Sequence, residues 1–171
     1  MELSEYEKAF SKYLSTFNFA KTPLATWDFY SSYFTDLKKS TSDTALLKSF
    51  EEKNNWQSSW DLGRELQEQT VIVLTDVNLK IVFASKNMVE MNGYHPEEVI
   101  GNHPKMFQGA ATDSTTSKAI GYAVRNRLPF NEVVVNYCKD GSLYKCEIKG
   151  FPIFDASGKL RNFIAFEKMV A

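Results

Sequence analysis

The residues best suited to chemistry lie in one short stretch, 101–109, and in the strands expected after it. The stretch carries an imidazole, an ammonium group and an amide, on His103, Lys105 and Gln108. Glycines at both of its ends, and the segment 96–100 with its leading proline, predict a tight connector after a brief helix. We expect side chains of this connector to reach into whatever space the neighbouring strands leave.

Metal and nucleophilic chemistry find little support in the sequence. The two cysteines, Cys138 and Cys146, fall in neighbouring expected strands, and neither belongs to a CxxC motif or a histidine-rich cluster. The sequence pattern offers no nucleophile with a base at hand and no glycine-rich phosphate loop. We therefore expect a protein that is not an enzyme, with two ordinary thiols.

Composition and charge narrow the class of protein further. The 171 residues are 43% hydrophobic, which suffices for one packed domain with an accessory segment. A formal net charge of -1 provides no overall field that would attract nucleic acid or an anionic membrane. The chain opens on acidic residues, and no apolar run approaches the roughly 20 residues of a membrane span. We expect a globular, cytoplasmic protein.

The first 68 residues have the apolar periodicity of helices. Ser4 and Glu7 are spaced as a capping box, and Thr22 precedes a proline that suits a first helical position. Helices are expected near residues 4–17, 22–37, 42–50 and 56–69. This predicts an all-helical N-terminal extension over 1–68.

From residue 70 the periodicity changes to that of strands. The β-branched runs 71–74 and 81–84 are separated by a polar turn, which predicts a hairpin. The elements expected after it are helices near 87–94, 96–100 and 114–126, the last capped by Thr112 or Asp113, and strands near 130–138, 143–154 and 160–170. The chain is therefore expected to be α+β, with a five-stranded antiparallel sheet and short helices over one face in a domain spanning 69–171.

Period-two alternation assigns the side chains of the last strands to faces. One face carries Tyr144, Cys146 and Ile148 on one strand and Phe163, Ala165 and Glu167 on the next. A hairpin loop centred on Gly141 would set Asn136 opposite Cys146 on this face. Cys138 would then be a diagonal neighbour of Cys146, too distant for a comfortable disulfide.

The opposite face of these strands is also apolar. It carries Val133, Val135, Ile164 and Phe166. An apolar patch of this kind marks a packing or interaction surface. We expect the N-terminal helices, with the aromatic residues around Trp27 and Tyr30, to dock there, and the protein to form a homodimer through this region.

Several short motifs accompany this order of elements. They are Phe83-Ala84-Ser85 with Met91-Asn92-Gly93-Tyr94, the segment 96–101, Phe107-Gln108-Gly109 with Thr112-Asp113, Asn136-Tyr137, Lys139-Asp140-Gly141 and Asn162-Phe163-Ile164. Together with the element order, they resemble the PAS domain family over about residues 70–170, and in particular its light-sensing LOV branch.

The resemblance implies a flavin site, and the chain departs from the branch where its chemistry lies. The LOV branch forms a light-driven flavin adduct with a cysteine in a Gly-Arg-Asn-Cys-Arg-Phe-Leu-Gln motif. The corresponding position here is Pro104, which has no nucleophile, so the resemblance excludes adduct chemistry at this position. The neighbouring asparagine corresponds to His103 and the first phosphate-binding arginine to Lys105, while Gln108 is retained.

The other contacts implied by the resemblance are only partly kept. The second phosphate-binding arginine corresponds to Gly121, which has no side chain. Of the two asparagines at the edge of the flavin ring, one is Asn136 and the other corresponds to Cys146. The glutamine that signals the flavin state corresponds to Glu167, and the glycine two residues before it to Ala165. A flavin is therefore possible but disfavoured on the sequence alone.

If the geometry of the family holds, polar groups of the chain converge on one cavity. The candidate contacts to a ligand are His103, Lys105, Gln108, Asn136, Cys146 and Glu167. The aromatic lining is expected from Phe83, Phe107 and Phe163. The alternative is a closed, filled core in which these polar groups satisfy one another, for instance by a pair between Glu167 and His103 or Lys105.

Three functions are consistent with these residues. The first is a non-enzymatic PAS sensory module that binds a small ligand or a partner protein and signals through its helical extension or dimer interface. The second is a flavin-binding photosensor without cysteine adduct chemistry. The third is a structural dimerisation module with a filled core. Ligand binding and core filling remain open alternatives at this point.

Overall fold

The computed structural model describes residues 25–171, apart from 58–59 and 69. Residues Leu37–Ala171 form one compact unit, so the helical residues from Leu37 onward belong with the sheet. The expected helix over 4–17 lies outside the described residues. The boundary expected between residues 68 and 69 stays a prediction.

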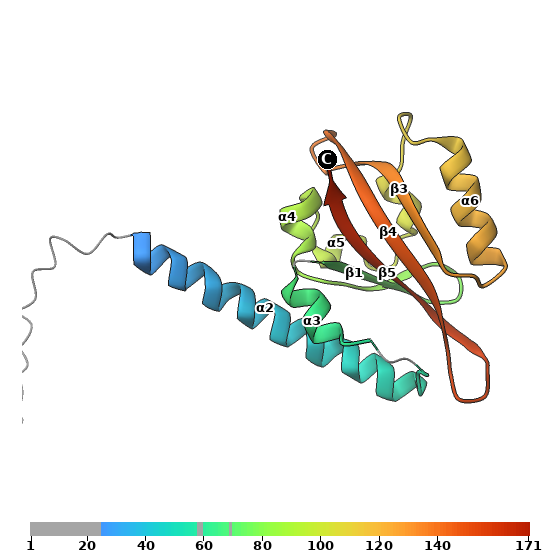
Figure 1. Ribbon diagram of the computed structural model, residues 1–171, viewed down its shortest axis with the longest axis horizontal. Coiled ribbons are helices and arrows are strands. Elements are labelled where there is room, and N and C mark those ends of the chain that lie inside the picture. Colours follow the sequence, from blue (N-terminus) through green and yellow to red (C-terminus); the bar gives the residue numbers. More distant parts are fainter. Residues whose placement is uncertain (1–24, 58–59, 69) are drawn as a thin grey trace, which may run out of the picture. The chain divides into compact units, whose positions relative to one another are not determined.

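A five-stranded antiparallel sheet forms the centre of this unit, as predicted (Figure 1). Its strands are β1 (Val71–Thr75), β2 (Ile81–Ala84), β3 (Phe130–Tyr137), β4 (Leu143–Phe154) and β5 (Leu160–Val170). They are ordered β2-β1-β5-β4-β3, which places the last strand of the chain in the middle of the sheet. Residues of β5 therefore have a strand on each side.

One face of the sheet, called the inner face, carries Val71, Val73 and Ala165 and packs against short helices. These are α4 (Met88–Asn92), α5 (Pro96–Val99) and the 3-10 turn η2 (Pro104–Phe107). The buried apolar residues on this side are Val71, Val73, Ile81, Ala84, Met88, Val99 and Phe107. The short helices thus close one side of the sheet, as expected.

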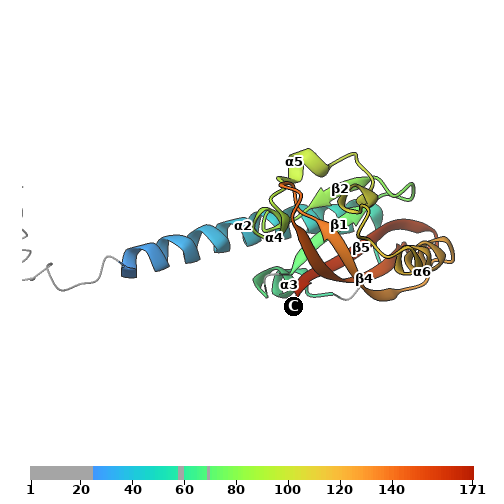
Figure 2. The ribbon, with the colours of Figure 1, turned by 90° about the horizontal axis from the view of Figure 1, so that it is seen from above.

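The opposite, outer face packs against helical residues that precede the sheet. They come from α2 (Ala25–Asn54), from α3 (Leu62–Gln67) and from the segment between them. The buried apolar residues of this second cluster are Leu47, Trp56, Leu62, Leu66, Ile72, Leu74, Phe83, Ile153, Ile164 and Phe166. Figure 2 shows α3 and α5 on opposite sides of the sheet.

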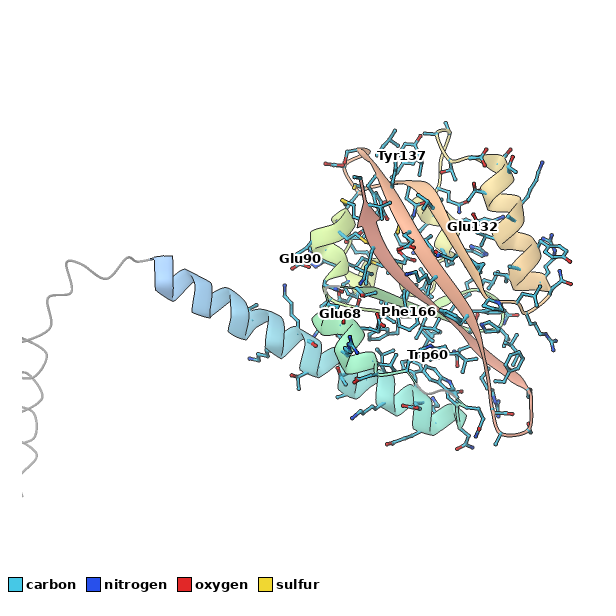
Figure 3. All side chains as sticks on the ribbon, viewed as in Figure 1. Trp60, Glu68, Glu90, Glu132, Tyr137 and Phe166 are labelled. Atoms are coloured by element: carbon cyan, nitrogen blue, oxygen red, sulfur yellow. The ribbon has the colours of Figure 1, made fainter. Side chains whose placement is uncertain are left out.

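Trp60 contributes an aromatic contact to this outer cluster. Its ring centroid lies 5.9 Å from that of Phe166, and Figure 3 shows the two side chains beside each other. The prediction that helices dock on the outer face is therefore confirmed for the helical residues of the unit that begins at Leu37. Val133 on β3 is still 50% exposed. The side chains of Trp27 and Tyr30 lie outside what the structure describes.

The prediction of separate helices near 22–37 and 42–50 is wrong, because α2 runs through this region without a break. The hydroxyl of Thr44 donates to the carbonyl of Ser40 at 2.8 Å, a bond that serine and threonine make inside helices. Asp43 accepts a hydrogen bond from the backbone N–H of Lys86 at 2.7 Å instead of capping a new helix. Of these two polar residues, Thr44 bonds within the helix and Asp43 makes a tertiary contact.

The helix expected from Trp56 begins later than predicted. Trp56 forms an isolated bridge with Asp155, and its indole N–H donates to Oδ1 of Asn162 at 3.1 Å. The helix starts after Asp61, whose carboxylate accepts from the backbone N–H of Arg64 at 3.1 Å. A buried polar partner in β5 therefore holds this tryptophan in place and outweighs the local helical pattern.

Helix α6 (Ser114–Arg125) lies beside β3 (Figure 1). Of the two predicted caps, Asp113 is the N-cap, since its Oδ2 accepts from the backbone N–H of Thr116 at 2.7 Å. The predicted helix is confirmed to within one residue at its C-terminal end. Among the described residues, no helix is long and apolar enough to cross a membrane.

The register between β3 and β4 differs from the prediction. Asn136 pairs with Tyr144, and Cys146 pairs with Val134, so Asn136 does not lie opposite Cys146. Side chains alternate between faces along a strand, and a shift of two residues keeps them on the same face. Asn136 and Cys146 therefore still share the inner face, as diagonal neighbours.

The hairpin loop explains this difference. Gly141 has a φ of 86°, in the left-handed region that favours glycine, and it is the last residue of a three-residue loop. The backbone N–H of Cys138 donates to the carbonyl of Ser142 at 2.8 Å and closes the loop, which is centred on Asp140. Cys138 is therefore not the diagonal neighbour of Cys146, and both thiols are free.

Candidate functional site

The stretch 101–109 forms the predicted tight connector and contains one 3-10 turn, η2. Pro104 occupies the first position of this turn, where its fixed φ and missing N–H are tolerated. Nδ1 of His103 accepts a hydrogen bond from the backbone N–H of Lys105 at 3.1 Å. Part of the hydrogen-bonding capacity of the imidazole is therefore committed to shaping the turn.

The end of the connector is fixed against β3. The hydroxyl of Thr112 donates to the carbonyl of Val135 at 2.6 Å and accepts from the backbone N–H of Gly109 at 3.0 Å. A Cβ atom on Gly109 would lie only 2.5 Å from the ring of Tyr137, which Figure 3 labels on β3. Because a side chain has no room there, the sequence requires glycine at this point.

Gln108 and Phe107 lie on this connector in different surroundings. Phe107 is 2% exposed, and its ring centroid lies 5.5 Å from that of Tyr94 in the inner-face cluster. The side chain of Gln108 is half-buried, and its Oε1 accepts from the hydroxyl of Ser117 on α6 at 3.4 Å. Phe107 therefore contributes to the inner core as predicted, and Gln108 bridges the connector to α6.

Three of the candidate polar residues meet on the inner face of the sheet. They are Asn136 on β3, Cys146 on β4 and Glu167 on β5, with exposed fractions of 3%, 0% and 5%. The thiol of Cys146 lies 3.8 Å from Oε2 of Glu167 and is oriented to donate to it. The same thiol lies 3.7 Å from the carbonyl of Glu147, so its single hydrogen has two acceptors.

Asn136 holds the group in this cluster that most needs a partner. Its Oδ1 is buried, and no group in the described part of the chain donates a hydrogen bond to it. Next to it, the hydroxyl of Tyr144 accepts from the amide of Asn92 at 3.3 Å. An unsatisfied buried acceptor costs about 1–3 kcal/mol, which a ligand N–H would recover.

The acids of this cluster all resist ionisation. Burial raises the pKa of Glu167 to about 7, and the hydrogen bond from Cys146 only partly opposes this rise. Burial, with the charge of Glu167 as a second cause, raises the pKa of the Cys146 thiol. Burial also raises the pKa of Tyr144. Near neutral pH Glu167 therefore exists partly as a neutral acid, which offers one donor and one acceptor.

His103 and Lys105 do not join this cluster. Burial, and then the charges of Lys105 and Lys80, lower the pKa of His103. Lys105 is exposed. Among the ion pairs of the described residues, none joins Glu167 to either side chain. Within the described residues Glu167 is therefore paired with neither cation, and its contact with Cys146 leaves the filled-core alternative open.

The aromatic lining is also smaller than expected. Phe83 belongs to the outer cluster, so the prediction that it lines the inner site is wrong. It pairs with Leu74, whose side chain also packs in the outer cluster. Phe163 pairs with Thr75 and, by alternation from Ala165, lies on the inner side of β5.

Two further polar residues, one on α6 and one beside the inner-face cluster, were missed by the sequence reasoning. A guanidinium nitrogen of Arg125 lies 3.3 Å from the position that a Cβ on Gly121 would occupy. Arg125 thus presents an exposed cation beside Gly121 on α6, and the spacing of four residues in a helix was the available signal. Asn92, part of a quoted motif, is 2% exposed and bonds to Tyr144.

The fold and the sequence together define the family. Residues 69–168 match the PAS domain. The chain belongs to the PAS domain family, and its five-stranded sheet with short helices has the PAS/LOV fold.

Curated relatives place the similarity within the LOV branch. The chain is 38% identical over 88 residues to protein TWIN LOV 1 of Arabidopsis thaliana, covering 51% of this chain and 22% of that protein. It is 33% identical over 106 residues to phototropin-2 of Oryza sativa subsp. japonica, covering 61% and 12%. It is 31% identical over 85 residues to a blue-light-activated histidine kinase of Brucella canis, covering 50% and 17%. The matched region is thus less than a quarter of each relative.

Solved structures share the fold of this chain. A light-oxygen-voltage domain studied with a flavin analogue is 26% identical, with a TM-score of 0.61 over 66% of this chain and 87% of that one. The dark structure of the Aureochrome1 LOV photoreceptor has a TM-score of 0.61 at 24% identity, over 67% and 86%. The resemblance to the LOV branch is confirmed, and the correspondence of Pro104 with the adduct cysteine stays a prediction.

Proposed function

We propose that this PAS module is a sensor that binds a flavin non-covalently on the inner face of its sheet. The observation that carries the proposal is the buried Oδ1 of Asn136, to which no described group donates. The edge of a flavin ring presents an N–H between two carbonyl groups, which matches an acceptor beside groups that donate. Similarity to LOV proteins, one of them studied with a flavin analogue, favours a flavin over other planar ligands.

The side chains of the chain fit such a group chemically. Asn136 and Glu167 would hold the edge of the ring, and Gln108 would hold its polar side chain. Lys105 and Arg125 are the cations for a phosphate, with the guanidinium suited to bidentate bonding. When bound, the flavin supplies blue-light absorption and a ring that accepts electrons.

The proposed binding is non-covalent because the connector provides no thiol. The sequence contains two cysteines, and Pro104 stands in the 101–109 stretch where the resemblance expects one. Cys146 is 0% exposed on β4, and burial raises its pKa, which disfavours the thiolate that nucleophilic attack needs. A light response would therefore depend on hydrogen bonds at the ring edge.

Two contacts support a route from the inner face to the helical extension. The first contact involves the residue just before Glu167 on β5. Phe166 lies on the outer side of this strand and packs against Trp60. The second contact joins α2 to the segment just before α4, where Asp43 of α2 accepts a hydrogen bond from the backbone N–H of Lys86. A change at the ring edge would alter these contacts and thereby the packing of α2.

We infer further that the module works in the cytoplasm, is not itself an enzyme, and transmits its signal as a homodimer or through a partner protein. The half-exposed Val133 on the outer face supports an interface at that edge of the sheet. Sedimentation of the whole chain and of residues 69–171 tests the dimer. A monomeric whole chain would contradict it.

The absorption spectrum and native mass of the whole chain, purified without added ligand, test the proposed function. A flavin band with the matching bound mass is expected. Asn136→Leu should weaken flavin binding more than it lowers the free energy of unfolding, because it removes the acceptor while keeping the branching of the side chain. A different bound mass would sink the flavin assignment. Absence of any ligand, with no binding of added flavin, would favour the filled-core dimerisation module.

A further inference from the structure

Glu167 occupies an unusual position for a carboxyl group. It lies on the central strand, paired with Val71 on β1 and Ile148 on β4, and is 5% exposed. Its one hydrogen-bond partner among the described residues is the weak thiol donor of Cys146. A carboxylate there would be charged, dry and poorly solvated.

In the part of the chain that the structure describes, no positive charge contributes to the environment of Glu167. β4 contributes Cys146 and Tyr144, two acids whose own charged forms are disfavoured by burial. β1 contributes apolar side chains to the inner cluster. On α4, Glu90 is exposed and bonded to Lys39. On η2, Lys105 is exposed, and among the described ion pairs none includes Glu167.

The neutral form of this acid is well suited to the site. A protonated carboxyl donates one hydrogen bond and accepts another, as a glutamine amide does. It would donate to a ring carbonyl, while Asn136 accepts from the neighbouring N–H. A carboxylate in the same place would face that carbonyl oxygen with a like partial charge and no proton between them.

We propose that Glu167 binds the ligand only as the neutral acid, so that the site takes up a flavin together with one proton. This inference rests on the proposed function and adds a condition to it, namely that Glu167 must be protonated when the flavin binds. The site thereby selects a neutral ring with adjacent carbonyl and N–H groups, and its occupancy depends on pH. Burial raises the pKa of this carboxyl to about 7, so the affinity for the flavin should depend on pH above that value.

Riboflavin is the appropriate probe, because it has the ring but no titrating phosphate. The whole chain, freed of any bound pigment, is titrated with riboflavin between about pH 6 and pH 9, with fluorescence as the readout. Above about pH 7 the affinity should fall towards tenfold per pH unit, since one proton is bound with the ligand. Glu167→Gln should bind with an affinity that does not change over this range.

Glu147→Gln is the matched control. Glu147 is a glutamate on β4 with a partly exposed side chain on the other side of the strand, bonded to Lys149, and its loss should leave the pH dependence intact. Calorimetry of the unaltered chain in two buffers of different ionisation enthalpy measures the number of protons taken up per riboflavin, and it needs no variant. Uptake approaching one proton per riboflavin above neutral pH is expected.

The outcomes separate the two proposals. Riboflavin binding whose affinity is independent of pH, with no proton uptake, would overturn the role of Glu167 and leave the flavin site standing. An equal pH dependence in Glu167→Gln would also overturn it. No binding of riboflavin at any pH, by the unaltered chain or by Glu167→Gln, would overturn both proposals.

Discussion

Replacing Glu167 by glutamine removes one ionisable group from the middle of the sheet and barely changes the shape of the side chain. The carboxyl is 5% exposed between β1 and β4 and receives a hydrogen bond only from Cys146 among the described residues. The amide oxygen of glutamine can accept the same bond. The substitution therefore isolates the free energy of burying the charge.

The magnitude follows from the shift in pKa. Folding raises the pKa of Glu167 from its ordinary value of 4.5 to about 7, because burial disfavours the charged form. A raised pKa means that the stability supplied by the protonated acid is fully present below pH 4.5 and is lost as the pH rises through 7. With about 1.4 kcal/mol for each pH unit, the total loss is about 3 kcal/mol.

Urea unfolding at about pH 4, 6 and 8 measures this effect, with the unaltered chain and Glu167→Gln compared at each pH. The difference in free energy of unfolding should grow in favour of the variant by about 3 kcal/mol across the range and level off above neutral pH. Glu147→Gln, with its partly exposed side chain, should show no such growth. A difference that stays constant within about 0.5 kcal/mol would refute the reasoning about burial.

Three further substitutions test how the site is positioned, each by urea unfolding. Gly109→Ala should destabilise by about 1–3 kcal/mol, because the new Cβ meets the Tyr137 ring, and an unchanged stability would mean that the connector is not held there. Leu47→Ala should cost about 2–5 kcal/mol at a fully buried position, whereas Leu46→Ala, at a 48% exposed position, should cost about 0.5 kcal/mol or less. Equal losses would argue against docking of α2 on the outer face. Asp43→Ala should cost about 1–3 kcal/mol by leaving a backbone N–H without its acceptor, and a loss below about 0.3 kcal/mol would remove this contact from the signalling route.

Much of the fold could be predicted from local signals. Strand-type patterns located all five strands, and alternation assigned the side chains of the last strands to their faces. Asp113 predicted the start of α6, and the glycines predicted the tight connector. Both signals act on the backbone of adjacent residues only. These features need only a few neighbouring residues to be specified.

The errors arose where distant residues decide the conformation. Asp43, inside the continuous helix α2, bonds to a backbone group beyond β2, and Trp56, before the late start of α3, bonds to Asn162. The shifted hairpin depends on which loop position Gly141 takes. No local pattern encodes these choices.

The candidate site was partly predictable for the same reason. Alternation placed Asn136, Cys146 and Glu167 on one face, and the sheet brings all three together. The separation of His103 from this cluster and the reach of Arg125 towards Gly121 depend on three-dimensional packing. The buried, unsatisfied oxygen of Asn136 likewise becomes visible only in the assembled fold.

The central claim is that the inner face holds a flavin through hydrogen bonds and without a thiol adduct. The absorption spectrum of the purified whole chain in the dark, under blue light and after denaturation tests it most directly. We predict a flavin band that is not lost to an adduct under blue light, and flavin that is released intact on denaturation. A colourless protein that also fails to bind added riboflavin, or a flavin that stays attached to the denatured chain, would contradict the account.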